Sequence, residues 1–221
     1  MNSKIVRIVV WGLVAVAVVV VLYIRVSRVQ VPRLLGEAQK QVDEGEANEM
    51  KLKTEDHQLL NGGGIPKAYL VAPAKNKAPT EDEFAKGTKE GPDVDWAKLE
   101  EAVAATDAKL AEIVKNYRAA AAKFEEGKTA VKSELVAEYF DLRSQAYQKR
   151  ADAEEARRKL LAVKLDKSIQ SDVERNRKFS ELSSQIGKSN GEFDALEEKA
   201  QKLREDNLDE FKRAGFGPSK D

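Results

Sequence analysis

The most apolar stretch of the chain lies near its N-terminus. Residues 8–24 read IVVWGLVAVAVVVVLYI, without a charge or a proline. As a helix rising about 1.5 Å per residue, such a run reaches roughly 25 Å, close to the hydrocarbon thickness of a bilayer. A helix that is apolar on every side is not expected to lie on a core in water. The run therefore predicts a transmembrane helix, with residues 1–31 forming a membrane anchor and its flanks.

The ends of the run suit a membrane–water boundary. Trp11 and Tyr23 lie near opposite ends, where amphipathic rings are favoured. Arg7 and Arg25 bracket the run and can extend their charges toward the headgroups. A cleaved signal peptide is the alternative, but the run continues into Tyr-Ile-Arg-Val-Ser-Arg without a small-residue cleavage site. We therefore expect a retained single-pass anchor.

The basic residues after the run bear on lipid contact and topology. Arg25, Arg28 and Arg33 could hold anionic lipid headgroups, or they could only orient the anchor. Positive charge after the run slightly exceeds that before it, which favours a cytoplasmic location for the large C-terminal part. The opposite, periplasmic orientation stays open. We expect a single-pass protein of a bacterial inner membrane.

Beyond the anchor, the polar and apolar positions follow helical periods. Residues 32–60 predict a juxtamembrane helix, which two glycines weaken. Further helices are predicted over 95–126, 128–167 and 172–210. In the first of these three, apolar or small residues recur at alternating steps of three and four, which is heptad spacing. The positions of this seam are Trp96, Leu99, Val103, Thr106, Leu110, Ile113, Tyr117, Ala120 and Phe124.

The predicted fold class is all-α. A single N-terminal transmembrane helix precedes residues 95–214, which form an irregular helical bundle or an antiparallel coiled-coil hairpin, and residues 215–221 form a tail. Gly127 is expected to separate the first two helices of this region. One continuous helix over 95–167 is the second choice, because the mixed seam residues suit a bundle better than a rod. Whether 179–210 is one helix or two stays open, although its uninterrupted phase favours one.

Residues 61–94 separate the juxtamembrane helix from the bundle. They contain four of the six prolines of the chain and five of its glycines. A structureless loop of this length is unusual inside a compact domain. The segment is therefore either a plain linker or a segment that docks on a partner, and a small apolar cluster argues for docking. The candidate partner-docking residues are Ile65, Tyr69, Leu70, Val71 and Trp96.

Composition narrows the classes of function. The chain has 38 basic and 38 acidic residues and a formal net charge of zero, so no excess of positive charge is available for a nucleic acid. The absence of cysteine excludes disulfides and thiolate metal sites. His57 is the only histidine, and it lacks the further residues that a metal site or a catalytic triad requires. We expect no catalytic residues, no metal, no cofactor and no small-molecule substrate.

Together these features favour a non-enzymatic accessory or scaffold subunit that packs on a larger membrane complex and stabilises it. Its expected partners are membrane lipid and the other subunits of that complex. An energy-converting complex of respiration or photosynthesis is one candidate, although no residue selects it. The alternative is a helical membrane protein that transmits a signal or a force, with Gly127 and Gly187 as its flexible points.

Overall fold

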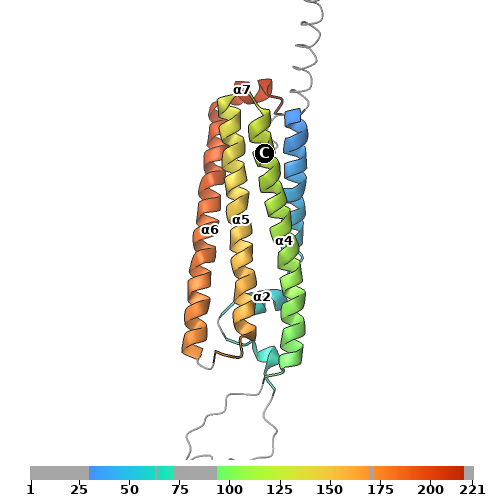
Figure 1. Ribbon diagram of the computed structural model, residues 1–221, viewed down its shortest axis with the longest axis vertical. Helices are drawn as coiled ribbons and strands as arrows, with labels where there is room; N and C mark the ends of the chain where they lie inside the picture. Colours follow the sequence, from blue (N-terminus) through green and yellow to red (C-terminus); the bar gives the residue numbers. More distant parts are fainter. Residues whose placement is uncertain (1–29, 63, 72–93, 170–171, 217–221) are drawn as a thin grey trace, which may run out of the picture. The chain divides into compact units, whose positions relative to one another are not determined.

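The computed structural model describes residues 30–62, 64–71, 94–169 and 172–216. These residues are almost entirely helical, and their β structure consists of an isolated antiparallel bridge between Leu70 and Val94. The prediction of an all-α helical bundle is therefore confirmed for the described part of the chain. The elements are a helix over 30–49, α2 (Thr54–Leu60), the 3-10 helix η1 (Lys67–Tyr69), α4 (Trp96–Ala130), α5 (Glu134–Leu165), α6 (Asp172–Asp206) and α7 (Leu208–Arg213) (Figure 1).

The predicted membrane anchor, residues 8–24, lies outside the described residues, so it stays a prediction. The same holds for its interfacial and lipid-binding candidates Arg7, Trp11, Tyr23, Arg25 and Arg28. Among the helices that are described, none is long and apolar enough to cross a membrane. Arg33 is described: it is exposed on the helix over 30–49, and its Nε lies 3.5 Å from a carboxylate oxygen of Glu37.

The chain folds into two compact units. Of the described residues, the first unit comprises 30–44, 116–150 and 190–216, and the second comprises 45–62, 64–71, 94–115, 151–169 and 172–189. Each of α4, α5 and α6 contributes residues to both units. Each unit has its own buried apolar residues, so each has a core of its own.

In the first unit, polar contacts join neighbouring helices around the core. Lys123 of α4 lies 3.3 Å from a carboxylate oxygen of Glu37, which belongs to the helix over 30–49. Ser144 of α5 donates a hydrogen bond of 2.9 Å to the Ala121 carbonyl of α4. Arg143 of α5 pairs with Glu197 of α6. The helix over 30–49 buries the stripe Val31, Leu34, Ala38 and Val42.

Aromatic rings fill the core of the first unit. Tyr139 meets Phe211 and Phe216 edge to face, with centroid distances of 5.3 and 5.4 Å. Phe124 of α4 stacks on Tyr147 of α5 at 5.6 Å. Such pairs contribute about 0.5–1.5 kcal/mol each beyond the area they bury.

The C-terminal residues 215–216 belong to this core rather than to the predicted tail. Gly215 has a φ of 95°, and its N–H donates to the Lys212 carbonyl, while the Phe216 N–H donates to the Phe211 carbonyl. These two bonds form a Schellman motif, which needs a left-handed residue after the helix. The motif turns the Phe216 ring onto Phe211, 5.0 Å away, and leaves Phe216 only 4% exposed.

The structure moves the predicted helix break from Gly127 to residues 131–133. Gly127 is buried inside α4, and a Cβ placed there would lie 2.8 Å from Cζ of Phe140 and closer still to two other ring carbons. The break falls where Ser133 caps α5, because its hydroxyl accepts a hydrogen bond of 3.2 Å from the Val136 N–H. The glycine therefore permits close packing rather than ending the helix.

Two other helix boundaries can be compared with the predictions: one within residues 32–60 and one within residues 179–210. The predicted helix over 32–60 is divided, because the Lys53 N–H donates to the Asp56 carboxylate at 2.7 Å and so starts α2 as a new helix. The open question about 179–210 is resolved in favour of one helix as far as Asp206, and the short α7 follows it.

In the second unit, α2 and η1 pack on α4 and on the C-terminal part of α5. The Asp95 N–H donates to the Tyr69 carbonyl at 2.9 Å, beside the Leu70–Val94 bridge. Lys98 of α4 reaches the Ala68 carbonyl at 3.4 Å. The core residues of this unit include Leu59, Leu60, Tyr69, Leu99, Val103, Leu160 and Leu161.

Candidate functional site: a groove between α4 and α5

Helical spacing in the second unit places a row of side chains on one face of α4 and a matching row on α5. On α4 the row follows positions i, i+3, i+4 and i+7, which share a face of a helix. These residues are Glu100, Val103, Ala104 and Asp107. The row on α5 consists of Glu155, Arg158, Lys159, Leu161, Ala162 and Leu165.

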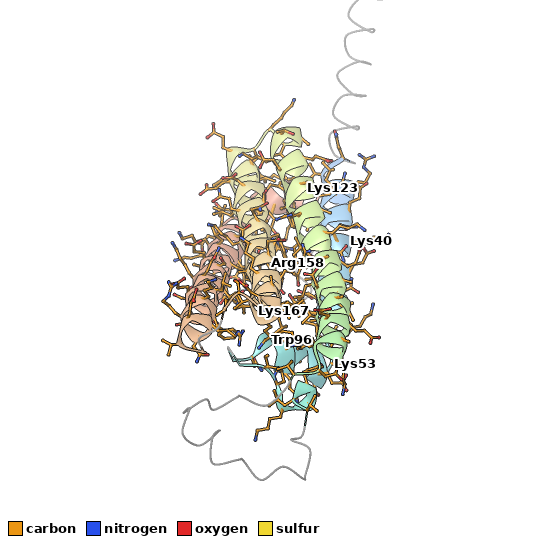
Figure 2. The ribbon with its side chains drawn as sticks, turned by 60° about the horizontal axis from the view of Figure 1, so that its bottom comes forward. Lys40, Lys53, Trp96, Lys123, Arg158 and Lys167 are labelled. Carbon is orange, nitrogen blue, oxygen red and sulfur yellow. The ribbon has the colours of Figure 1, made fainter. Side chains whose placement is uncertain are left out.

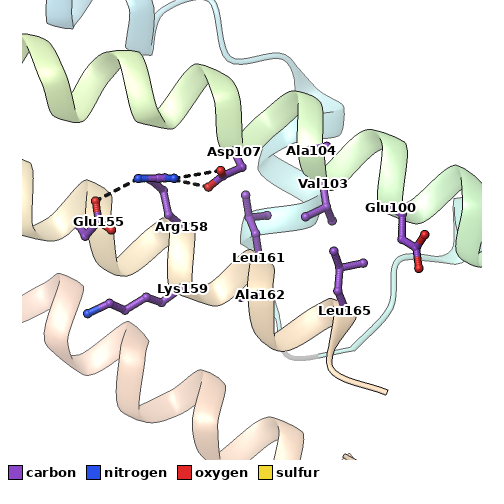
Figure 3. A pocket seen from close by; sticks show the side chains of 10 residues that line it. All are labelled: Glu100, Val103, Ala104, Asp107, Glu155, Arg158, Lys159, Leu161, Ala162 and Leu165. Carbon is purple, nitrogen blue, oxygen red and sulfur yellow. Dashed lines mark hydrogen bonds and ion pairs between the residues drawn. The ribbon is translucent and has the colours of Figure 1, made fainter. Parts of the chain in front are cut away.

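The two rows enclose an open groove of about 430 Å³ (Figure 3). Its apolar lining comes from Val103, Leu161 and Leu165, with Ala104 and Ala162 between them. Both alanines are exposed, and their small side chains leave the two backbones accessible. A surface of this kind allows another helix to approach closely, because small residues let helix axes come near one another.

Two ion pairs join α4 to α5 and to the turn that follows α5, and their α4 members Asp107 and Glu100 lie about two turns apart. Arg158 binds Asp107 with two hydrogen bonds of 2.8 and 3.0 Å, drawn as dashed lines in Figure 3, and this contact raises the pKa of the guanidinium. Lys167 lies 2.9 Å from a carboxylate oxygen of Glu100. The Lys167 amine also lies 5.0 Å from the centroid of the Trp96 ring (Figure 2). The pairs connect the two walls of the groove at its polar edge.

The rim of the groove carries one cation without an ion pair. Lys159 is exposed on α5, and it forms no ion pair with the residues that the structure describes. Arg158, in contrast, is paired with Asp107 and Glu155. The groove thus combines an apolar floor with an exposed lysine on its rim, while its other charged lining residues take part in ion pairs within the chain.

A buried carboxylate anchors α2 to α4 on the same unit. Asp56 is 4% exposed, and its two oxygens accept hydrogen bonds from Thr106 at 2.6 Å, from Lys109 at 2.6 and 2.9 Å, and from the Lys53 N–H at 2.7 Å. Burial alone would raise the pKa of this carboxyl. The bonds from Lys109, Thr106 and Lys53 outweigh burial and lower the pKa below its usual value.

A buried lysine holds the glycine-rich turn after α2. Lys164 of α5 is fully buried, and its Nζ donates hydrogen bonds of 2.8 Å to the carbonyls of Gly62 and Gly64. The amine also lies 5.6 Å from the centroid of the Phe179 ring of α6. Burial, with a smaller contribution from the charge of Arg175, lowers the pKa of Lys164 to about 8. Gly62 has a φ of 72°, which glycine adopts without strain.

The five predicted docking residues are brought into the second unit but not onto one exposed surface. Tyr69 is 7% exposed, so its ring is buried within the chain itself. Leu70 and Trp96 are half-buried beside the bridge and beside Lys167, and Ile65 is also half-buried. Val71 is 47% exposed and is the most accessible of the five. Docking of these residues on a partner stays a prediction.

The groove residues and the buried lysine were not among the sequence candidates. The sequence contained one signal for Lys164, namely a lysine at a position where an apolar residue is expected. Lys164 lies four residues after Leu160, which lies seven residues after Ala153, and this spacing places all three on the buried face of α5. The groove had no such signal, because its alanines and charged residues look like an ordinary exposed helix face until α4 and α5 are placed side by side.

Searches of the part of the chain that the structure describes found no group of acidic or histidine side chains able to hold a metal ion. His57 is exposed at the end of α2. Comparisons with known protein families, with curated proteins and with solved structures found no match to this chain.

Proposed function

We propose that this protein is a non-enzymatic, single-pass membrane accessory subunit that binds a neighbouring subunit through the α4–α5 groove. The apolar run at residues 8–24 supports the membrane attachment. The groove supports the binding role, and it is the observation on which the proposal depends. An energy-converting complex is one setting for such a subunit, with the bundle on the cytoplasmic side of a bacterial inner membrane.

The occupant that fits the groove best is an amphipathic helix of a partner. The alanines Ala104 and Ala162 allow close approach of a helix, and the half-buried Leu165 supplies apolar contact. The ion pairs that bracket the groove are already satisfied within the chain, so they need no charged partner. Lys159 is the exception, and it would be complemented by an acidic side chain at the edge of the incoming helix.

A matched pair of substitutions on α4 tests this proposal. Ala104→Trp would fill the groove, whereas Ala105→Trp places the same ring on the neighbouring exposed position, which does not line the groove. We expect a partner that co-purifies with the wild-type protein from native membranes in mild detergent to be lost at least tenfold with Ala104→Trp. It should be retained with Ala105→Trp. Mass spectrometry of the purified complexes measures the difference.

Charge complementarity is tested on the same complexes. Lys159→Glu should weaken co-purification of the partner, and the loss should shrink in high salt because the rim is exposed. Equal recovery of all subunits with Ala104→Trp and with wild type would contradict binding through the groove. Recovery of the full-length protein in the soluble fraction would contradict the membrane attachment instead.

In the alternative, a signal- or force-transmitting protein, Gly127 and Gly187 were expected to be flexible points. Gly127 is buried against Phe140, which fixes this part of α4 by packing. Gly187 has open space around it, but it lies within the uninterrupted helix α6. The accessory-subunit proposal is therefore the one that the local structure favours.

A further inference from the structure

A segment of the second unit covers the C-terminal part of α5 and the N-terminal part of α4. We define it as the strap, residues 54–62 and 64–71, which contain α2 and η1. Its polar attachments are discrete: Asp56 and the Ala68 carbonyl bind α4, Leu70 bridges Val94, the Tyr69 carbonyl accepts from Asp95, and the carbonyls of Gly62 and Gly64 accept from Lys164. A segment held by discrete attachments opens locally more readily than the long helices beneath it.

We propose that the strap opens locally from the bundle, and that Lys164 sets the free energy of this opening. On opening, the Lys164 amine loses its hydrogen bonds to the Gly62 and Gly64 carbonyls and forms hydrogen bonds to water instead. In the closed state the amine is fully buried, with hydrogen bonds to two carbonyls and with the Phe179 ring nearby. The carbonyls are neutral, and no carboxylate among the described residues forms an ion pair with this amine. Opening returns the amine to water, where its charge is better solvated.

The groups that face Lys164 decide the direction of the effect. The strap presents backbone carbonyls, and α6 presents the Phe179 ring together with Arg175, whose guanidinium donates to the Ile169 carbonyl at 3.0 Å. The charge that acts on the amine is therefore positive, and it adds to the effect of burial. Both favour the neutral amine in the closed state.

This gives opening a defined pH dependence. The pKa of Lys164 is about 8 when the strap is closed and returns toward 10.5 when the amine is in water. Opening therefore takes up a proton between these two values, so it becomes less favourable as the pH rises through that range. Below about pH 7 the amine is protonated in both states, and opening no longer depends on its titration.

The full-length chain contains no cysteine, so a single introduced thiol reports opening. Leu60→Cys places the probe in α2, where Leu60 is 9% exposed, in both the wild-type and the Lys164→Met backgrounds. At each pH, the rate at which the thiol is labelled in detergent is divided by the labelling rate of the same thiol in the urea-unfolded protein. This ratio removes the effect of pH on the reactivity of the thiol itself. We expect the normalised rate to fall roughly tenfold from pH 7 to pH 9 with Lys164 present, from the two pKa values above. With Lys164→Met it should be low at pH 7 and independent of pH up to pH 9. Above pH 9 the Tyr69 phenol also contributes, because burial in the closed strap raises its pKa above the ordinary value of 10.0.

Two controls separate local opening from other effects. Lys159→Met removes an exposed lysine from the same helix and should leave the pH dependence unchanged. A thiol at Val136→Cys, in the core of the first unit, should show no such dependence. A flat wild-type profile, or a Val136→Cys profile that follows Leu60→Cys, would overturn the proposal. So would a Lys164 pKa near 10.5 measured by NMR of the folded protein, a readout that needs no substitution.

Discussion

Gly127→Ala is expected to lower the free energy of unfolding by about 2 kcal/mol. Replacing glycine by alanine inside a helix normally stabilises a protein by about 0.5–1 kcal/mol. Here the new methyl group would overlap Cδ1, Cε1 and Cζ of Phe140, a ring that is fully buried and packed against Phe124. Overpacking of a filled core costs about 1–3 kcal/mol, and this cost outweighs the gain in helix propensity. Urea unfolding of the full chain in detergent, followed by circular dichroism, measures the change.

Gly187→Ala is the matched control for this prediction. Gly187 also lies inside a long helix, but a Cβ there would meet nothing within 4 Å. We therefore expect Gly187→Ala to stabilise the protein by about 0.5–1 kcal/mol. In a Phe140→Ala background, Gly127→Ala should lose most of its destabilising effect, because Cδ1, Cε1 and Cζ, the ring carbons that it would overlap, are gone. Equal effects of the two alanines would contradict a packing role for Gly127.

The same glycine shows what hydrophobic periodicity can and cannot predict. The seam of α4 follows from spacing alone, and its positions from Leu99 to Phe124 are buried. The place where α4 ends did not follow from the sequence, because a glycine within a helix reads as a helix breaker until its neighbour is known. Ser133 begins the next helix through a hydroxyl cap, which is a local signal that the more prominent glycine obscured.

The candidate site was less predictable than the fold for a different physical reason. A groove is a property of two helices, and its α4 residues Ala104 and Asp107 have no distinguishing pattern within their own helix. The strap was noticed through its apolar residues, but the sequence could not show that Tyr69 packs on its own chain rather than on a partner. Polar anchors such as Lys164 are hidden among 38 basic residues until burial distinguishes one of them.

Asp56→Asn is expected to destabilise the protein by about 2–4 kcal/mol. The carboxylate accepts every hydrogen bond directed at it from Lys53, Thr106 and Lys109, and it lies almost entirely away from water. An asparagine would direct an amide N–H₂ at one of these donors and leave polar groups unpaired inside the unit. Lys109 is 37% exposed and can turn toward water, which keeps the expected loss below the upper limit for buried ion pairs. Urea unfolding of the full chain measures this loss.

The pH dependence of this loss shows whether Asp56 stabilises the protein through the negative charge of its carboxylate or only through the packing of its side chain. Because the folded-state pKa of Asp56 lies below its usual value of 3.8, its contribution to stability is present above that value and is lost as the pH falls through the folded-state pKa. The difference in unfolding free energy between wild type and Asp56→Asn should therefore be constant near neutral pH and shrink below about pH 4. Asp107→Asn is the control, since this carboxylate is 38% exposed and pairs with Arg158 at the surface, where loss of an ion pair costs about 1 kcal/mol or less. A difference for Asp56→Asn that stays constant down to pH 3 would show that the anchor acts through its shape and not through its charge.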